Sequence, residues 1–149
     1  MTEHDHAVYV AADYAKKHLA RQVAERLEEL GIGSTARWYS SQPAYKDNGL
    51  GGELEGEDAV AAARVAQEDM DDIQSANLFV QLTTGELHRG GRTTELGYAI
   101  ALKQSWPERL VVCVGPREHA FHYHPLVAHV ETVDQLMAFL RGWTLAMDS

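Results

Sequence analysis

The sequence predicts an α/β fold, a three-layer doubly wound domain with a mainly parallel sheet of about five strands. The first observation behind this prediction is that short apolar runs alternate with longer segments whose apolar residues recur at helical spacing. The second is the length of those segments, because helices of roughly ten or more residues between strands favour right-handed crossovers and parallel pairing. Domains of this kind are called Rossmann-like or flavodoxin-like.

Each element is predicted from its own pattern. Apolar runs predict strands at residues 7–12, 34–39, 78–83, 110–115 and, as a short strand, 127–130. Helical spacing predicts a helix through residues 19–30 that ends at Gly31, and further helices over about 57–75, about 93–104 and 133–143. Residues 45–56 are rich in glycine and charge and are expected to form a mobile loop, and residues 1–6 a frayed terminus. All these elements fit a single domain over residues 1–149.

The composition narrows the classes of function. The formal net charge of −9 repels a phosphate backbone, which argues against duplex nucleic acid as a partner. No apolar run approaches the roughly 20 residues that cross a bilayer, and the first residues do not resemble a secretory signal. The single cysteine, Cys113, lies in an apolar run, where a buried thiol is expected, and its solitude is consistent with a reducing, cytoplasmic compartment. A small neutral or singly phosphorylated ligand is compatible with this composition.

A carboxylate occupies the apolar stripe of the helix predicted over residues 57–75. Helical spacing calls for a stripe member at position 69, and this member is Asp69, among Ala62, Val65, Ala66, Met70 and Ile73. A carboxylate on a buried stripe costs several kcal/mol unless it is paired or hydrogen-bonded, so its presence indicates a function. Glu68, Asp71 and Asp72 lie off the stripe and are expected to face solvent. The alternative for Asp69 is a helix cap or an ion-pair partner.

A second carboxylate, Glu95, is expected in the first turn of the helix that follows the third strand. It shares a helix face with Tyr98, Ala99 and Leu102. The helix dipole is expected to keep it ionised, as a nucleophile requires. Ligands of doubly wound sheets bind beyond the carboxyl ends of the strands, where both carboxylates are expected. The pair is therefore a candidate for glycoside cleavage, in which a carboxylate attacks the anomeric carbon. The alternative for Glu95 is a residue that only serves the helix dipole.

Three segments, taken together, resemble the nucleoside 2-deoxyribosyltransferase family and its relatives, the deoxynucleoside 5′-monophosphate N-hydrolases. They are the opening strand with its tyrosine (8–14), the Asp-containing helix end (69–77) and the Glu-Leu-Gly segment (90–99). The resemblance spans most of the chain, from Val8 to the last helix.

The resemblance implies roles for individual residues. Glu95 would attack C1′ of the sugar and form a glycosyl-enzyme intermediate, Asp69 would hold Glu95 and the sugar, and Tyr9 would orient Glu95. Tyr14 and Trp38 would be platforms for the base, with an exposed loop aromatic and a core tryptophan as their respective alternatives. The turn at Ala11 and Asp13 would approach the substrate. The resemblance implies no cofactor, a nucleoside or nucleoside monophosphate as substrate, and a homo-oligomer.

Some residues depart from the pattern of the family. Ala11 and Ala12 stand where the family often has glycine, and Arg89 stands where transferases carry an acid that handles the base, a task for which Glu86 and His88 lie near enough. A 5′-phosphate could instead bind Arg89 and Arg92 with the amides of Gly90 and Gly91. The alternative is that both arginines are solvated or pair with acidic groups. Sugar transfer to another base is the first prediction, and hydrolysis of a deoxynucleoside 5′-monophosphate is its close alternative.

The histidine-rich segment after the fourth strand has two interpretations. His119, His122 and His124 have spacings that a zinc ion could accept, but no Cys or acidic ligand is well placed, so no metal is predicted. The resemblance instead implies that Phe121, His122 or His124 helps to complete the pocket of a neighbouring subunit. Three functions remain open: transfer of deoxyribose between bases, hydrolysis of a deoxynucleoside or its monophosphate, and nucleotide binding without chemistry.

Overall fold

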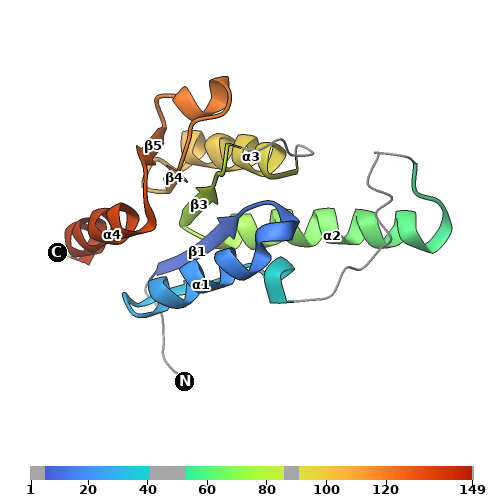
Figure 1. Cartoon of the computed structure of the whole chain (residues 1–149), viewed down its shortest axis with the longest axis horizontal. Coiled ribbons are helices and arrows are strands. Elements are labelled where there is room, and N and C mark those ends of the chain that lie inside the picture. Colours follow the sequence, from blue (N-terminus) through green and yellow to red (C-terminus); the bar gives the residue numbers. More distant parts are fainter. Residues whose placement is uncertain (1–5, 41–52, 86–90, 149) are drawn as a thin grey trace.

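The computed structural model describes residues 6–40, 53–85 and 91–148, and its strands form one parallel sheet in the order β2-β1-β3-β4-β5 (Figure 1). The strands are β1 (His6–Ala11), β2 (Ile32–Ser34), β3 (Leu78–Leu82), β4 (Leu110–Val114) and β5 (Val127–Val130). Apolar side chains of β1, β3 and β4 are almost fully buried, as expected for parallel strands covered on both faces. The predicted doubly wound α/β fold is confirmed.

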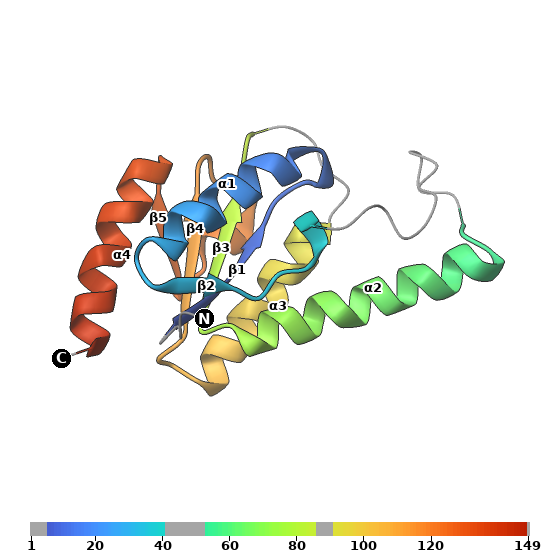
Figure 2. The same cartoon turned by 90° about the horizontal axis from the view of Figure 1, so that it is seen from below.

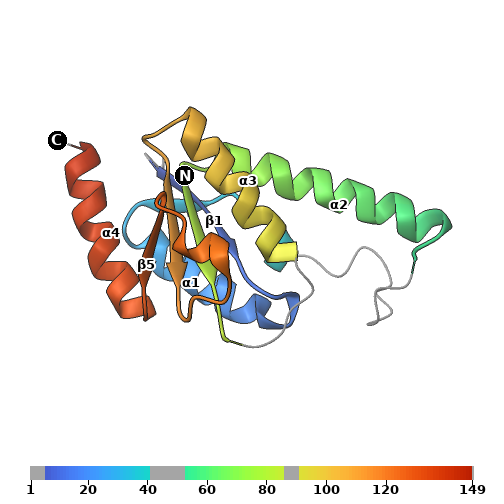
Figure 3. The same cartoon turned by 90° about the horizontal axis from the view of Figure 1, so that it is seen from above.

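The helices cover the two faces of the sheet in pairs. They are α1 (Lys17–Glu28), α2 (Gly56–Ser75), α3 (Gly91–Ser105) and α4 (Val133–Asp148). Helices α2 and α3 lie side by side on one face, and α1 and α4 lie on the other (Figures 2 and 3). Short 3₁₀ turns follow strand ends at Tyr14–Lys16 (η1), Trp38–Ser40 (η2) and Ala120–Tyr123 (η3). None of the helices in the described ranges combines the length and apolar character that a bilayer crossing requires.

The second strand differs from the prediction. It spans Ile32–Ser34, so it shares only Ser34 with the predicted strand 34–39, and Trp38 and Tyr39 belong to η2. The reason is a set of hydrogen bonds to the end of α2: Thr35 Oγ1 donates to the Asp72 carbonyl (2.7 Å), and the Arg37 amide donates to Asp72 Oδ2 (3.1 Å). Thr35 still donates its amide to the Val8 carbonyl of β1 (2.9 Å), and the contacts with Asp72 tie the residues that follow to α2.

The ends of three predicted segments also change. His6 belongs to β1 and not to a frayed terminus, because Nε2 of its ring pairs with Asp148 Oδ1 (3.0 Å). The same contact explains why α4 continues to Asp148, beyond the predicted end at residue 143. Gly56 begins α2 and is not part of a loop, whereas residues 41–52, which include most of the predicted mobile loop, lie outside the described residues.

Helix α2 does not bury the stripe that its sequence suggests. Its N-terminal half extends beyond the sheet (Figure 2), and of the predicted stripe only Ile73 is fully buried, while Met70 is 42% exposed. Since the sheet and α3 cover only the C-terminal end of α2, helical spacing alone predicts burial over too long a segment.

Candidate active site

Tyr9 and Glu95 meet at the centre of the candidate site. Tyr9 projects from β1, is 0% exposed and stacks on Phe79 of β3, with ring centroids 5.9 Å apart. Its hydroxyl donates a hydrogen bond to Glu95 Oε2. Burial and the neighbouring carboxylates Glu95 and Asp69 raise the pKa of the Tyr9 phenol far above its ordinary value, so Tyr9 remains a neutral donor. A fixed phenol thus orients one oxygen of Glu95.

Glu95 is less readily ionised than the sequence suggests. Burial raises the pKa of Glu95 from 4.5 to about 8; the hydrogen bond from Tyr9 opposes this rise and the charge of Asp69 adds to it. The expectation that the helix dipole keeps Glu95 ionised is therefore corrected. Because α3 begins at Gly91, Glu95 lies beyond its first turn, where the effect of the dipole has already declined.

Asp69 reaches the same site from α2. Burial and the charges of Asp72 and Glu68 raise its pKa to about 6, while Arg37 lowers it. The charge of Asp69 in turn raises the pKa values of both Tyr9 and Glu95, so the three side chains lie within electrostatic range of one another. The structure therefore brings together the three residues that the sequence singled out for chemistry.

Asp72 is buried, in contrast to the expectation from the sequence. It was expected to face solvent, but it is only 6% exposed and forms an ion pair with Arg37, whose Nη2 lies 2.9 Å from Asp72 Oδ1. The amide of Arg37 donates to the other carboxylate oxygen, so Asp72 fixes the chain after β2. No pattern within α2 could have revealed this partner, because Arg37 is distant in sequence.

The two predicted base platforms lie near each other. The rings of Tyr14 and Trp38 are 6.3 Å apart at 45°, and Trp38 Nε1 donates to the carbonyl of Val10 (2.9 Å). That bond anchors the indole to β1 at the residue after Tyr9. Tyr14 is 46% exposed, and Lys17 Nζ lies 5.1 Å from its ring centroid. Ala11, predicted to approach the substrate, is fully buried as the last residue of β1.

Arg92 pairs with acidic side chains, which is the alternative to a phosphate contact named in the sequence analysis. Its side chain is 2% exposed and forms ion pairs with Asp13 (2.9 Å) and Glu118 (2.8 Å). The predicted phosphate contact is therefore corrected: two carboxylates already surround this guanidinium and would repel an anion. Asp13 is likewise turned toward Arg92. Gly91 is the first residue of α3, whereas Arg89 and Gly90, like Glu86 and His88, lie outside the described residues.

The histidine-rich segment contains both buried and exposed side chains. His122 is 1% exposed, and its Nε2 contacts Gln81 Oε1 inside the protomer, so the expectation that it reaches another subunit is corrected. Phe121 is 55% exposed, and His124 accepts a hydrogen bond from the Leu126 amide (3.1 Å). A role for Phe121 or His124 across an interface stays a prediction. The described residues contain no group of three His, Cys, Asp or Glu side chains arranged to hold a metal ion.

Gln81 and Glu118 are two functional candidates that the sequence analysis missed. Gln81 is 0% exposed in the middle of the sheet, and Glu118 pairs with Arg92. The signal for Gln81 was available, since a polar residue inside the apolar run 78–82 must find hydrogen-bond partners.

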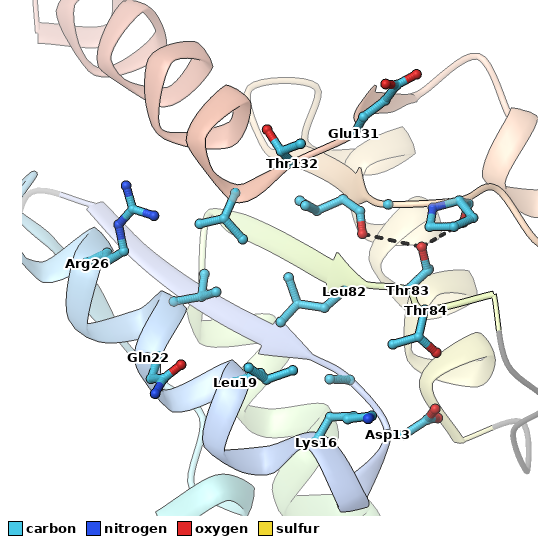
Figure 4. Close-up of a pocket in the computed structure, with 16 residues that line it drawn as sticks. Asp13, Lys16, Leu19, Gln22, Arg26, Leu82, Thr83, Thr84, Glu131 and Thr132 are labelled. Carbon is cyan, nitrogen blue, oxygen red and sulfur yellow. Dashed lines mark hydrogen bonds between the residues drawn. The ribbon is translucent and has the colours of Figure 1, made fainter.

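A cavity of about 510 Å³ lies on the other face of the sheet, between α1 and α4 (Figure 4). Leu19, Val23 and Leu82 contribute to its apolar lining, and Asp13 and Lys16 lie at its edge. Tyr9, Asp69 and Glu95 are not among its lining residues. The chemistry-bearing carboxylates Asp69 and Glu95 and this cavity are therefore separate features of the described residues.

The comparisons with known proteins agree with the fold. The chain is similar to the solved structure of the Clostridium botulinum CMP N-glycosidase BcmB, with a TM-score of 0.52 and 16% sequence identity over 90% of this chain and 97% of that chain. At this identity the similarity shows a shared fold. No protein-family model matches the chain, and no curated protein matches it.

Proposed function

We propose that the protein cleaves the N-glycosidic bond of a nucleoside or nucleoside monophosphate, with Glu95 as the nucleophile. The observation that carries the proposal is the hydrogen bond from the buried Tyr9 to Glu95, with Asp69 in electrostatic range. Attack on an anomeric carbon requires an oriented carboxylate as nucleophile and a second carboxyl group that can move a proton. Glu95, oriented by Tyr9, and Asp69, with its raised pKa, match these two requirements. The shared fold with a CMP N-glycosidase supports the same reaction class.

In the proposed reaction, the ionised Glu95 attacks C1′ and the bond from C1′ to the base nitrogen breaks. The base leaves with the bonding electron pair and takes up a proton, and the sugar remains as an ester of Glu95. In the second half, water or another base attacks C1′, the ester bond breaks and Glu95 returns as a carboxylate. Asp69, whose pKa is raised to about 6, is suited to move a proton near neutral pH.

Hydrolysis and sugar transfer differ only in the second acceptor. The fold similarity to an N-glycosidase favours water as the acceptor, and so does Arg89, which replaces the acid that transferases use on the base. Sugar transfer to a second base stands as the alternative within this proposal, and nucleotide binding without turnover is the alternative of another class.

The test is an analysis of products by mass spectrometry. Wild-type protein is incubated with ribo- and deoxyribonucleosides and their 5′-monophosphates, CMP included, with and without a second free base. Free sugar or sugar phosphate together with the free base indicates hydrolysis, and a new nucleoside indicates transfer. Tight binding without any product from the whole panel would contradict the proposed reaction and support the binding domain.

The matched control is a glutamate outside the site. Glu95→Ala is compared with Glu108→Ala, because Glu108 is exposed in the turn after α3. We expect loss of product only in the first variant, and capture of a sugar adduct on the peptide that contains Glu95 in the wild type. Equal activity of the two variants would exclude Glu95 as the nucleophile.

A further inference from the structure

Four polar residues form a closed ring beside the start of α3, and two of its links are made by main-chain groups, the Glu118 amide and the Arg92 carbonyl. The four residues are Gln81 of β3, Arg92 of α3, and Glu118 and His122 of the segment after β4. Gln81, Arg92 and His122 are 0%, 4% and 1% exposed, and the Glu118 side chain is 11% exposed. Burial of four polar groups is costly unless their hydrogen bonds are satisfied, so the arrangement has to serve the fold or the site.

Each residue of the ring donates to the next in the same order, from Glu118 to His122, Gln81 and Arg92. The Glu118 amide donates to His122 Nδ1 (2.9 Å), which places the imidazole proton on Nε2, facing Gln81 Oε1. Gln81 Nε2 then donates to the carbonyl of Arg92 (2.6 Å), and Arg92 Nη1 lies 2.8 Å from Glu118 Oε1 in an ion pair. The three hydrogen bonds polarise one another, and the ion pair between Arg92 and Glu118 closes the ring, so the ring resists displacement of any one member.

The ring connects α3 to three loops at the carboxyl edge of the sheet. Arg92 Nε donates to Asp13 Oδ1 (2.9 Å) in the loop after β1, and Arg92 Nη1 donates to the Leu82 carbonyl (3.3 Å) at the end of β3. Glu118, after β4, also accepts from the Gly85 amide through Oε2 (2.9 Å). The second residue of α3 is thus tied to every central strand of the sheet.

Glu95 follows Arg92 by three residues, which is almost one helical turn. The two side chains are therefore held on neighbouring parts of one rigid segment, and a shift of Arg92 displaces Glu95 from the Tyr9 hydroxyl. We propose that Arg92 is a positioning residue, which fixes the nucleophile helix against the loops after β1, β3 and β4. This proposal rests on the proposed function, because it gives Arg92 a role in placing Glu95 for attack.

The experiment compares Arg92→Lys with Arg109→Lys. Lysine keeps the charge but cannot bridge Asp13, Glu118 and the Leu82 carbonyl at once. Arg109 is the control, because its guanidinium also donates to two carbonyls, those of Ala76 (2.6 Å) and Gln74 (2.8 Å), away from the ring. Measurements are kcat and KM for the substrate found in the product screen, and the NMR resonance of the Tyr9 phenol proton, assigned with Tyr9→Phe.

We expect Arg92→Lys to lower kcat about 100-fold with KM changed less than about threefold, as misplacement of a reacting group does. The Tyr9 phenol resonance should shift or vanish in this variant and persist in Arg109→Lys. Wild-type kcat and an unchanged phenol resonance in Arg92→Lys, with only a lower Tm, would overturn the positioning role. If Arg92→Lys does not fold, Gln81→Met breaks the ring without changing charge, and the same two measurements decide.

The two proposals fail in distinguishable ways. Absence of glycosidic cleavage by the wild type contradicts the proposed function but leaves the phenol resonance as a readout of where Glu95 lies. Cleavage by the wild type together with full activity of Arg92→Lys and Gln81→Met contradicts only the positioning role.

Discussion

Two groups of carboxylates lie at the same end of the sheet and differ in their partners. Asp13 and Glu118 surround Arg92, which is an arrangement of buried ion pairs. Glu95 instead accepts from the neutral Tyr9, and burial together with the charge of Asp69 raises its pKa to about 8. A cationic partner stabilises the ionised form of a carboxylate. A carboxylate whose partner is a neutral phenol keeps its reactivity as a nucleophile, but its ionised form is less stable when buried. The first group therefore fixes the structure, and the second carries the proposed reaction.

The largest expected effect separates the two groups by activity. Glu95→Ala should lower kcat/KM at least about 1,000-fold, because it removes the carboxylate that is proposed to form the ester with the sugar. Steady-state kinetics with the substrate from the product screen measure this loss, and circular dichroism checks the fold. A variant that keeps a tenth of the wild-type rate would place the nucleophile elsewhere.

A smaller effect is expected from the second carboxylate. Asp69→Asn should lower kcat about 10- to 100-fold by removing a group that holds or moves a proton. It also removes a negative charge that raises the pKa of Glu95, so the rise of kcat/KM with pH should move to lower pH. The pH profile of kcat/KM measures this shift, and Asp71→Asn, at an exposed position of α2, is the control. A profile that stays in place would show that the two carboxylates do not interact.

Burial of Glu95 without a cationic partner lowers the stability of the protein, so replacing Glu95 with a neutral residue should raise the free energy of unfolding. The pKa of Glu95 is raised from 4.5 to about 8 in the folded protein, so the folded state binds this proton more tightly than the unfolded state, and stability falls as pH rises between these two values. Glu95→Gln should therefore raise the free energy of unfolding by about 1–3 kcal/mol at pH 7.5 and change it little at pH 4. Urea titrations at both pH values measure the difference, and a variant less stable than the wild type at pH 7.5 would contradict the assignment.

The smallest effect has the opposite sign. Asp13→Asn weakens the ion pair with Arg92 and leaves the guanidinium with one carboxylate partner, Glu118. It should lower the free energy of unfolding by about 1 kcal/mol, a modest loss because the Asp13 side chain is 26% exposed. Thermal unfolding beside Glu95→Gln tests the comparison directly, since both substitutions replace a carboxyl group with an amide at the same edge of the sheet. Stabilisation by both would mean that net charge, and not pairing, controls stability here.

The sequence predicts the fold well because periodicity reports burial, and burial decides which segments become strands and helices. Tyr9, Asp69 and Glu95 could be identified because a polar group in an apolar pattern and a family resemblance coincide at these positions. The pairs Arg37–Asp72 and Arg92–Glu118 could not, because each joins residues that only the folded topology brings together. The pKa of Glu95 was missed for the same reason, since its burial depends on β1 and α2 as much as on its own helix.

The stacking of Tyr9 on Phe79 joins the site to the middle of the sheet. A fully buried phenol that stacks on its neighbour across two paired strands has lost its rotational freedom during folding, so substrate binding need not spend free energy on ordering it. The same feature links activity to the integrity of the sheet. Tyr9 is therefore not expected to unfold locally before the rest of the sheet. On heating, loss of its hydrogen bond to Glu95 should coincide with cooperative unfolding of the strands.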